Sequence, residues 1–231
     1  MLKWNGYQLK TYPDNDLARR MKIIKYYNID TIFDIGANMG QYAFQMRELG
    51  YKKRIISFEP LKSAFEVLRK NSRKDINWIV NNYALGNEDT NGVINVAYNS
   101  VSSSILNMLP IHLNRAPHSK YISKEEIKIK KLDSIFNSFC NEKNNVMIKI
   151  VAQGYEKNVI DGASESLNCI KIIHLEMSLI PLYENEMIYI DKIKYLDNKG
   201  FKLISLENGL FDRTTGQLMQ VYGIFEKKTS I

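Results

Sequence analysis

The stretch Thr31-Ile32-Phe33-Asp34-Ile35-Gly36-Ala37-Asn38-Met39-Gly40 carries most of the information about the fold. Its first half is an apolar run typical of a buried strand, and the residues after Gly40 have the pattern of a helix. In open α/β sheets a strand, a glycine-containing turn and a helix form the corner where ligands bind. Gly36 permits close backbone approach to a ligand, Gly40 permits tight packing at the helix start, and Asn38 tolerates a positive φ.

The spacing of these glycines distinguishes between nucleotide cofactors. A dinucleotide fingerprint reads Gly-x-Gly-x-x-Gly, whereas the pattern from Asp34 to Gly40 is Asp-x-Gly-x-x-x-Gly. A carboxylate at Asp34 suits a ligand with a cationic amino group, such as S-adenosylmethionine. A second predicted strand ends at Glu59, which can accept hydrogen bonds from both ribose hydroxyls. The two carboxylates predict a nucleoside-sized site; a turn glycine beside a helix-capping carboxylate is the structural alternative.

The rest of the chain alternates strands with helices, which predicts a mostly parallel sheet covered on both faces. We expect strands over 31–35, 54–58, 78–80, 92–98, 146–150, 170–175, 201–206 and 218–225. We expect helices over 14–27, 40–49, 61–68, 132–139, 155–160 and 188–196. The last two strands should form an antiparallel hairpin at the sheet edge. We expect one domain over 1–231, with an N-terminal helical cap over about 1–29 and an insertion over about 99–131, loop-like as far as Lys124.

Composition narrows the class of protein. The chain has 231 residues, of which 45% are hydrophobic and 25% are charged, and these values argue against disorder. No run approaches the roughly 20 apolar residues of a membrane span, and Met1–Lys10 lacks a signal-peptide core. Only Cys140 and Cys169 are present, which fits a cytoplasmic protein without a disulfide framework. The net charge of +7 reflects either a Lys-rich lineage or an acidic partner such as nucleic acid, a glycan or a membrane surface.

At this point the sequence resembles the FkbM family of S-adenosylmethionine-dependent methyltransferases. The resemblance rests on the order and spacing of segments 33–40, 58–60, 82–86, 131–135, 148–150, 153–156, 175–176, 200–201 and 220–221. It implies a class I methyltransferase fold, which is α/β and Rossmann-like. That fold has a seven-stranded sheet that is parallel except for its last strand. It also implies O-methylation, typically of a hydroxyl of a sugar, a glycan or a natural product.

The resemblance also implies which residues surround the cofactor. At the methionine end these are Asp34, Gly36, Asn38 and Gly40; Glu59 would hold the ribose; and near the adenine lie Asn82, Ala84 and Leu85.

Two departures from the family concern the substrate side of the sheet. Val151 and Tyr222 stand where the family usually has aspartates. Carboxylates at these positions could bind a divalent metal, orient a hydroxyl or act as a base, so we predict no metal site. Three explanations stay open: a metal-independent enzyme with another base, an inactive cofactor-binding protein, or an altered sequence.

Glu176 and Lys149 are the remaining candidates for catalysis. Glu176 ends the strand predicted over 170–175 and is either a base or a structural carboxylate. Lys149 lies in an apolar strand, where lysine is rare unless it is paired; Glu156 and Glu176 are its candidate partners. Among the histidines, His174 is expected to be structural, whereas His112 and His118 reach the substrate only if the insertion closes over the site. Tyr155 either stacks on a sugar ring or packs in its helix.

The leading hypothesis is therefore S-adenosylmethionine-dependent O-methylation of a sugar, glycan or similar small metabolite. The second is a catalytically impaired protein that binds the same cofactor, supported by Val151 and Tyr222. The hypothesis of a nucleic-acid methyltransferase is supported only by the net positive charge, and the basic residues are scattered along the sequence rather than clustered. A nicotinamide-dependent oxidoreductase is disfavoured by the spacing of Gly36 and Gly40.

Overall fold

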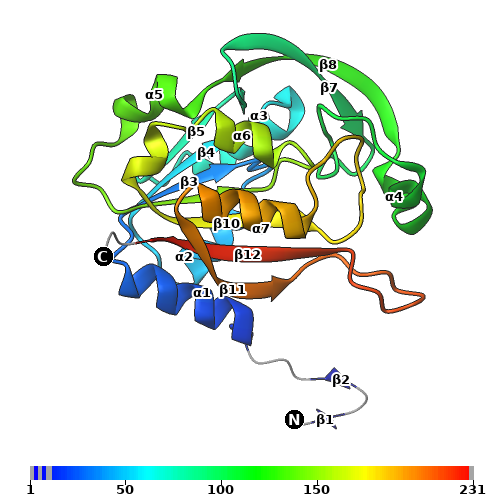
Figure 1. Cartoon of the computed structure of the whole chain (residues 1–231), viewed down its shortest axis with the longest axis horizontal. Coiled ribbons are helices and arrows are strands. Elements are labelled where there is room, and N and C mark those ends of the chain that lie inside the picture. The colour runs from blue at the N-terminus through cyan, green and yellow to red at the C-terminus, as the bar shows by residue number, and fades with distance from the viewer. Residues whose placement is uncertain (1–2, 5–6, 9–11, 229–231) are drawn as a thin grey trace.

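The computed structural model describes residues 3–4, 7–8 and 12–228, and its centre is a seven-stranded sheet (Figure 1). The strand order is β11-β12-β10-β9-β3-β4-β5. In that order the bounds are Phe201–Asn208, Gln220–Lys227, Ile170–Ser178, Val146–Ile150, Thr31–Ile35, Arg54–Phe58 and Trp78–Asn81. Six of the strands run in the same direction, and β12 runs opposite to them. The predicted class I methyltransferase fold is confirmed.

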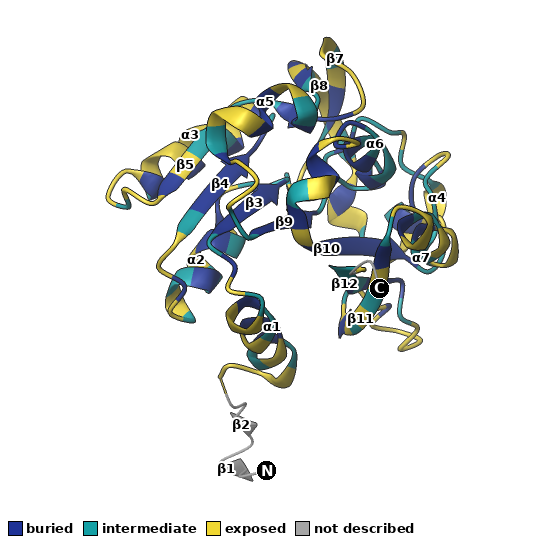
Figure 2. Cartoon of the chain, turned by 60° about the vertical axis from the view of Figure 1, so that its left-hand side comes forward, coloured by how far each residue is buried: buried dark blue, intermediate teal, exposed yellow. Residues whose placement is uncertain are grey.

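Helices cover both faces of this sheet, and its central strands β4, β3, β9 and β10 are almost entirely buried (Figure 2). One face packs against α1 (Asn15–Tyr26), α2 (Gln41–Glu48) and α3 (Lys62–Ser72). The other packs against α5 (Leu132–Phe139), α6 (Glu156–Asp161) and α7 (Tyr189–Asn198). Because β3 and β9 lie between two helical layers, every residue of both strands is buried, as their continuous apolar runs require.

The N-terminal region contains a short antiparallel pair, β1 (Lys3–Trp4) with β2 (Tyr7–Gln8), followed by α1. Of the helical cap expected over 1–29, residues 1–2, 5–6 and 9–11 lie outside the described residues. No helix in the described ranges is both long and apolar enough to cross a membrane.

Two glycines fix the geometry of the β3–α2 turn. Gly36 has φ +73°, and a Cβ on it would lie 2.0 Å from the Val151 carbonyl oxygen. Gly40 has φ +96°, and a Cβ on it would meet the Trp78 ring at 2.6 Å. Gly36 therefore permits contact between the turn and the end of β9, whereas Gly40 permits the helix start to pack on β5.

The insertion differs from its prediction. A second sheet has the order β6-β8-β7, from Ala84–Leu85, Tyr121–Lys130 and Thr90–Ala97, and its two long strands lie beyond the central sheet (Figure 1). The expectation of a loop as far as Lys124 was wrong, because β8 begins at Tyr121 and pairs with β7 along its length. Only Ile127 and Ile129 of β8 are buried, so its first half lacks an apolar signal. The short helices are α4 (Pro110–Arg115), η1 (Pro117–Ser119) and η2 (Ser166–Cys169).

The C-terminal hairpin also differs in position. β11 and β12 are antiparallel as predicted, but only β11 is an edge strand, because β12 inserts between β11 and β10. This arrangement places the first residues of β12 beside the last residues of β10, at the end of the sheet where the parallel strands have their carboxyl ends.

Candidate functional site

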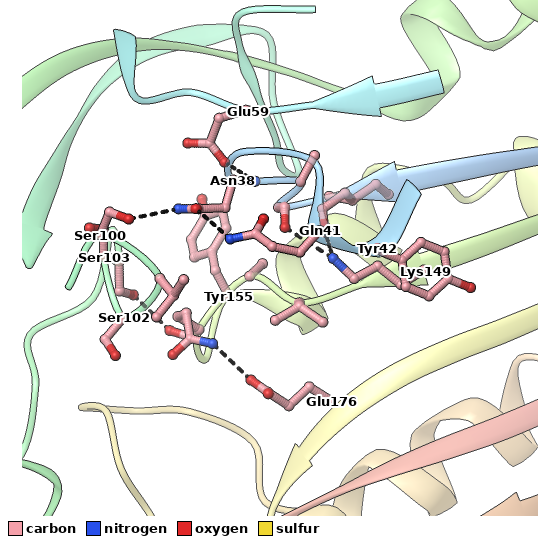
Figure 3. Close-up of a pocket in the computed structure, with 18 of the residues that line it drawn as sticks. Asn38, Gln41, Tyr42, Glu59, Ser100, Ser102, Ser103, Lys149, Tyr155 and Glu176 are labelled. Atoms are coloured by element: carbon pink, nitrogen blue, oxygen red, sulfur yellow. Dashed lines mark hydrogen bonds between the residues drawn. The ribbon is translucent and has the colours of Figure 1, made fainter. Parts of the chain in front are cut away.

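A cavity of about 660 Å³ opens at the carboxyl ends of the central parallel strands (Figure 3). This volume is typical of a small-molecule or cofactor site. The turn after β3, the end of β4 and the short strand β6 line one side, and the ends of β9 and β10 with the start of β12 line another. The insertion supplies a further wall through Ser100–Ser104. Its place at the strand ends agrees with the site predicted for open α/β sheets.

Glu59 is a buried carboxylate held by backbone amides. The amide of Asn38 donates to Oε2 at 2.7 Å, and the amide of Leu61 donates to Oε1 at 2.9 Å. Burial raises the pKa of Glu59 to about 7, against the lowering effect of these two bonds. A carboxylate oxygen has two acceptor directions, so each oxygen retains one for a ligand hydroxyl. These acceptors fit the pair of hydroxyls of a ribose.

Asn38 connects the glycine turn to the insertion. Its φ is +47°, its Nδ2 donates to Ser100 Oγ at 3.0 Å, and its Oδ1 accepts from Gln41 Nε2 at 3.1 Å. The side chains of Asn38 and Gln41 therefore lie between the Ser100 wall and Lys149, as Figure 3 shows. This contact fixes the mouth of the cavity against the β3–α2 turn.

Asp34 and Lys149 form a buried ion pair across adjacent strands. Lys149 Nζ lies 2.9 Å from Asp34 Oδ1 and donates to the Gly36 carbonyl at 3.0 Å. Ser57 Oγ donates to Asp34 Oδ2 at 3.1 Å. The predicted pairing of Lys149 with Glu156 or Glu176 was therefore wrong. Asp34, predicted at the methionine end of the cofactor, is fully buried, is absent from the cavity lining and faces a protein cation. Its role at the ligand stays a prediction.

The other residues expected at the cofactor divide into two groups. Those that line the cavity are Gly36, Asn38, Glu59, Ala84 and Leu85. Gly40 and Asn82 do not line it. Asn82 Nδ2 instead donates to the carbonyls of Glu59 at 2.9 Å and Pro60 at 3.0 Å, so it supports the loop that presents Glu59.

Glu176 lines the cavity on the side of β10 and is 5% exposed. Gln153 Nε2 donates to its Oε2 at 2.9 Å, and the Tyr222 hydroxyl donates to its Oε1 at 3.0 Å. The Tyr183 hydroxyl donates to Gln153 Oε1 at 2.6 Å, which fixes the amide so that its NH₂ faces Glu176. Burial, and secondarily the charge of Glu156, raise the pKa of Glu176 to about 7.

Val151 and Tyr222 both lie at the cavity. Tyr222 is the cross-strand partner of Glu176, which explains why its hydroxyl reaches that carboxylate. Glu176 is therefore the acid that borders this part of the wall. In the described part of the chain, no group of three or more His, Cys, Asp or Glu side chains is arranged to hold a metal ion.

Two of the three histidines line the cavity. His112 is 2% exposed, and its ring lies edge-on to Tyr183 with centroids 5.2 Å apart. His174 Nε2 lies 3.3 Å from Glu207 Oε2. Burial lowers the pKa of each imidazole to about 4, so both are neutral at pH 7. His118 is exposed and does not line the cavity.

Arg20 is a cavity residue that the sequence analysis missed. It projects from the buried face of α1 and forms a bidentate pair with Glu207 of β11, with the Arg20 Nε bond at 3.1 Å. A signal was available, since Arg20 shares the helix face of Leu17, Met21 and Ile24. A charged residue on the apolar stripe of a helix requires a buried partner.

Comparisons with known proteins were made for sequence and for fold. The family described as Methyltransferase FkbM domain matches residues 34–203. No curated protein matches the chain. Three solved structures are similar at low identity, and the two with TM-scores of 0.50 and 0.51 bear on the fold alone.

The first of these, described provisionally as an S-adenosylmethionine dependent methyltransferase from Listeria monocytogenes, is 10% identical. The alignment covers 93% of this chain and 98% of that one, with a TM-score of 0.51. TehB from Haemophilus influenzae is 10% identical over 95% of this chain and 64% of its own, with a TM-score of 0.50. A protein described provisionally as an RNA methyltransferase from Pyrococcus horikoshii is 13% identical. The alignment covers 96% of this chain and 88% of that one, with a TM-score of 0.49.

The match over 34–203 includes the glycine turn, Glu59 and Glu176. This match agrees with the strand order of the central sheet and with the cavity at its strand ends, and it identifies the family of the protein. The chain belongs to the FkbM methyltransferase family, and S-adenosylmethionine is its cofactor.

Proposed function

We propose that this protein methylates a hydroxyl oxygen of a sugar, a glycan or a similar small metabolite. The observation that carries the proposal is Glu176, a buried carboxylate at the cavity that accepts two side-chain hydrogen bonds and forms no ion pair with any described residue. A pKa of about 7 matches the task of a general base at neutral pH. Such a base is what an alcohol acceptor requires, because the hydroxyl must lose its proton as it is methylated.

The residues fit the cofactor in the following way. Glu59 offers two free acceptor directions for the ribose hydroxyls, Ala84 and Leu85 offer apolar surface for the adenine, and Gly36 leaves room beside β9. When bound, the cofactor supplies an electrophilic methyl group on a sulfonium. The Asn38–Ser100 contact and the Glu59–Asn38 bond hold the turn that faces it.

Glu176 then acts on the acceptor. Gln153 and Tyr222 fix the two carboxylate oxygens, so the carboxylate is oriented before the acceptor arrives. As the acceptor oxygen forms its bond to the methyl carbon, its proton passes to Glu176. Positioning of the reacting groups and proton removal each lower the barrier, the latter by about 10²- to 10⁴-fold. Lys149 serves the reaction indirectly, by holding the β3–α2 turn through the Gly36 carbonyl.

The acceptor wall favours a neutral hydroxylated compound. Ser102, Ser103 and Ser104 line it. Ser102 Oγ contacts Ser119 Oγ at 2.9 Å and accepts from Asn99 Nδ2 at 3.0 Å, and Ser103 Oγ accepts from the Ala97 amide at 2.9 Å. Ser104 Oγ donates to the Gln153 carbonyl at 2.7 Å and accepts from the Leu106 amide at 3.0 Å. A hydroxyl has one donor and two acceptor directions, so each keeps capacity for a ligand. Tyr155 adds an aromatic surface to the same cavity.

The test is transfer of a radiolabelled methyl group from S-adenosylmethionine to a panel of neutral methyl glycosides, oligosaccharides and polyols. Wild type is expected to label at least one class, with the label in an ether-linked methyl group. The Glu176→Gln variant should lose the transfer, whereas Glu142→Gln, an exposed carboxylate of the same charge, should keep it. Label on nitrogen or carbon of the acceptor would contradict the proposal.

A second candidate is a cofactor-binding protein without turnover, favoured by Val151 and Tyr222 at the positions of the family aspartates. It predicts cofactor affinity with no transfer to any acceptor, and recovery of transfer in a Val151→Asp, Tyr222→Asp double variant. Methylation of nucleic acid has weaker support, because Arg20 and Lys149 at the cavity are both paired with carboxylates. The free thiols Cys140 and Cys169 support a cytoplasmic location.

A further inference from the structure

We propose that the cavity selects its ligand by charge: Glu176 holds the sulfonium form of the cofactor more tightly than the neutral thioether that remains after transfer. This inference rests on the proposed function, because it takes the cavity to be the methyl-transfer site. It adds a property that the fold does not require, namely a preference for the methyl donor over the spent cofactor.

The first observation is that the cavity has no free cation among its described side chains. The basic groups that line it are Arg20 and Lys149. Arg20 is paired with Glu207, and Lys149 lies 2.9 Å from Asp34; the side chains of the two acids are 2% and 0% exposed. His112 and His174 are neutral at pH 7, since burial lowers the pKa of each to about 4. The positive charge of the wall is therefore cancelled within the wall.

The second observation is that the acids lining the cavity, Glu59 and Glu176, form no ion pair with a cation of the described residues. Glu59 accepts from two backbone amides, and Glu176 accepts from an amide and a phenol, all neutral donors. Lys192 pairs with Glu156 at 2.7 Å and reaches Glu176 only at its backbone carbonyl, at 3.1 Å. The charges of Lys192 and Lys149 lower the pKa of Glu176, but burial outweighs them. When Glu59 and Glu176 are ionised, this arrangement is complementary to a cationic ligand.

The two acids lie on different sides of the cavity, as Figure 3 shows. If Glu59 holds the ribose and Glu176 takes the acceptor proton, the reacting methyl lies between the ribose and Glu176. The sulfonium would then face a buried carboxylate across the acceptor oxygen, in surroundings where Coulomb attraction is several times stronger than in water.

Charge balance during transfer agrees with this arrangement. The S–CH₃ bond breaks, the CH₃–O bond forms, the electron pair stays on sulfur, and the hydroxyl proton moves to Glu176. A sulfonium and a carboxylate thereby become a thioether and a carboxylic acid. The attraction that held the donor disappears in the same step, which favours release of the spent cofactor.

Calorimetric titration at pH 8 with three ligands tests the proposal without an acceptor. The ligands are S-adenosylmethionine, S-adenosylhomocysteine and sinefungin, in which a carbon bearing a protonated amine replaces the sulfonium. Wild type should bind each cationic ligand at least about tenfold more tightly than the thioether. This ratio should be the same in 50 mM and in 500 mM salt, because salt screens a buried charge pair only weakly. Equal affinities, or tighter binding of the thioether, would overturn the proposal.

A substitution of Glu176 tests whether this carboxylate causes the preference for cationic ligands. Glu176→Gln should weaken the two cationic ligands about tenfold and leave S-adenosylhomocysteine unchanged, while Glu142→Gln should change none of the three. Equal weakening of all three ligands by Glu176→Gln would assign Glu176 a structural role and refute charge selection. If Glu176→Gln does not fold, the wild-type comparison still decides. Failure of wild type to bind any of the three would refute the cofactor site itself, which is a different result from binding without selection.

Discussion

Asp34 and Glu176 are both buried carboxylates near the carboxyl end of the same sheet, yet their surroundings differ. Asp34, in β3, faces the ammonium of Lys149 and the hydroxyl of Ser57. Glu176, in β10, accepts hydrogen bonds from the neutral donors Gln153 and Tyr222 and forms no ion pair within the described part of the chain. The cross-strand register accounts for this: Asp34 is opposite Lys149 in β9, and Glu176 is opposite Tyr222 in β12.

The presence or absence of a buried cation gives the two carboxylates different properties. A buried carboxylate with a buried cation is neutral as a pair, does not line the cavity and ties two strands together. A buried carboxylate without a cation is unstable as an ion, and its pKa rises towards neutrality. We therefore propose that Glu176 exchanges a proton with a ligand, and that Asp34 supports the structure around the site.

Glu176→Gln should produce the largest functional effect. We expect methyl transfer to fall by about 10²- to 10⁴-fold, because the base is lost while the shape of the side chain is kept. The new amide oxygen can accept from Gln153 Nε2, and the new NH₂ group can donate to the Tyr222 hydroxyl oxygen. The free energy of unfolding should not fall at pH 8. The measurement is initial transfer rate on the acceptor identified by the panel, with urea unfolding in parallel. A variant with wild-type rate would remove Glu176 from the mechanism.

Asp34→Asn should act on stability instead. Removing one member of a buried ion pair leaves an uncompensated Lys149 and costs about 3–5 kcal/mol. Urea unfolding at pH 7 measures this loss, and the double variant Asp34→Asn, Lys149→Met should recover part of it. A loss below about 1 kcal/mol, the value of an exposed pair, would show that the pair is not a structural element.

The pH dependence of stability should sharpen the contrast. Burial raises the pKa of folded Glu176 to about 7, against 4.5 for the ordinary carboxyl. The folded state then binds this proton more tightly than the unfolded state, so the contribution of Glu176 to stability is full below about pH 4.5 and is lost as pH rises to about 7. Urea unfolding at several pH values gives the free energy of unfolding as a function of pH. Between about pH 4.5 and 7, the Glu176 proton should contribute a fall of this free energy in wild type that is absent in Glu176→Gln. Parallel slopes would show that Glu176 does not titrate in this window.

Tyr222→Phe should give the smallest effect. The Tyr222 hydroxyl donates to Glu176 and lowers its pKa, so its removal should raise that pKa further. The acid limb of the kcat/KM profile should move to higher pH by less than about one pH unit, as expected for one hydrogen bond worth about 1 kcal/mol. A purely structural tyrosine would lower the rate without moving the limb.

The sequence was sufficient for most of the fold. β3, β4 and β9 have their predicted bounds because continuous apolar runs end at glycine or polar residues. β8 was missed because its first half is charged and exposed, and its strand character comes from pairing with β7.

For the site, Glu59 and Glu176 were accessible to prediction because each ends or nearly ends a recognisable strand. The partner of Lys149 was not, since the choice of Asp34 depends on β9 lying beside β3 rather than on any local pattern. Tyr222 could be singled out as a departure from the family. Its bond to Glu176, however, follows from the register of β12 with β10.

The central claim is that the cavity around Glu59 binds the cofactor. The most direct test is a calorimetric titration of S-adenosylhomocysteine into wild type, Glu59→Ala and Glu66→Ala, the last an exposed carboxylate of the neighbouring helix α3. The account predicts micromolar affinity in wild type and Glu66→Ala, and its loss in Glu59→Ala with the fold retained by circular dichroism. Absence of binding by folded wild type, or undiminished binding by Glu59→Ala, would contradict it.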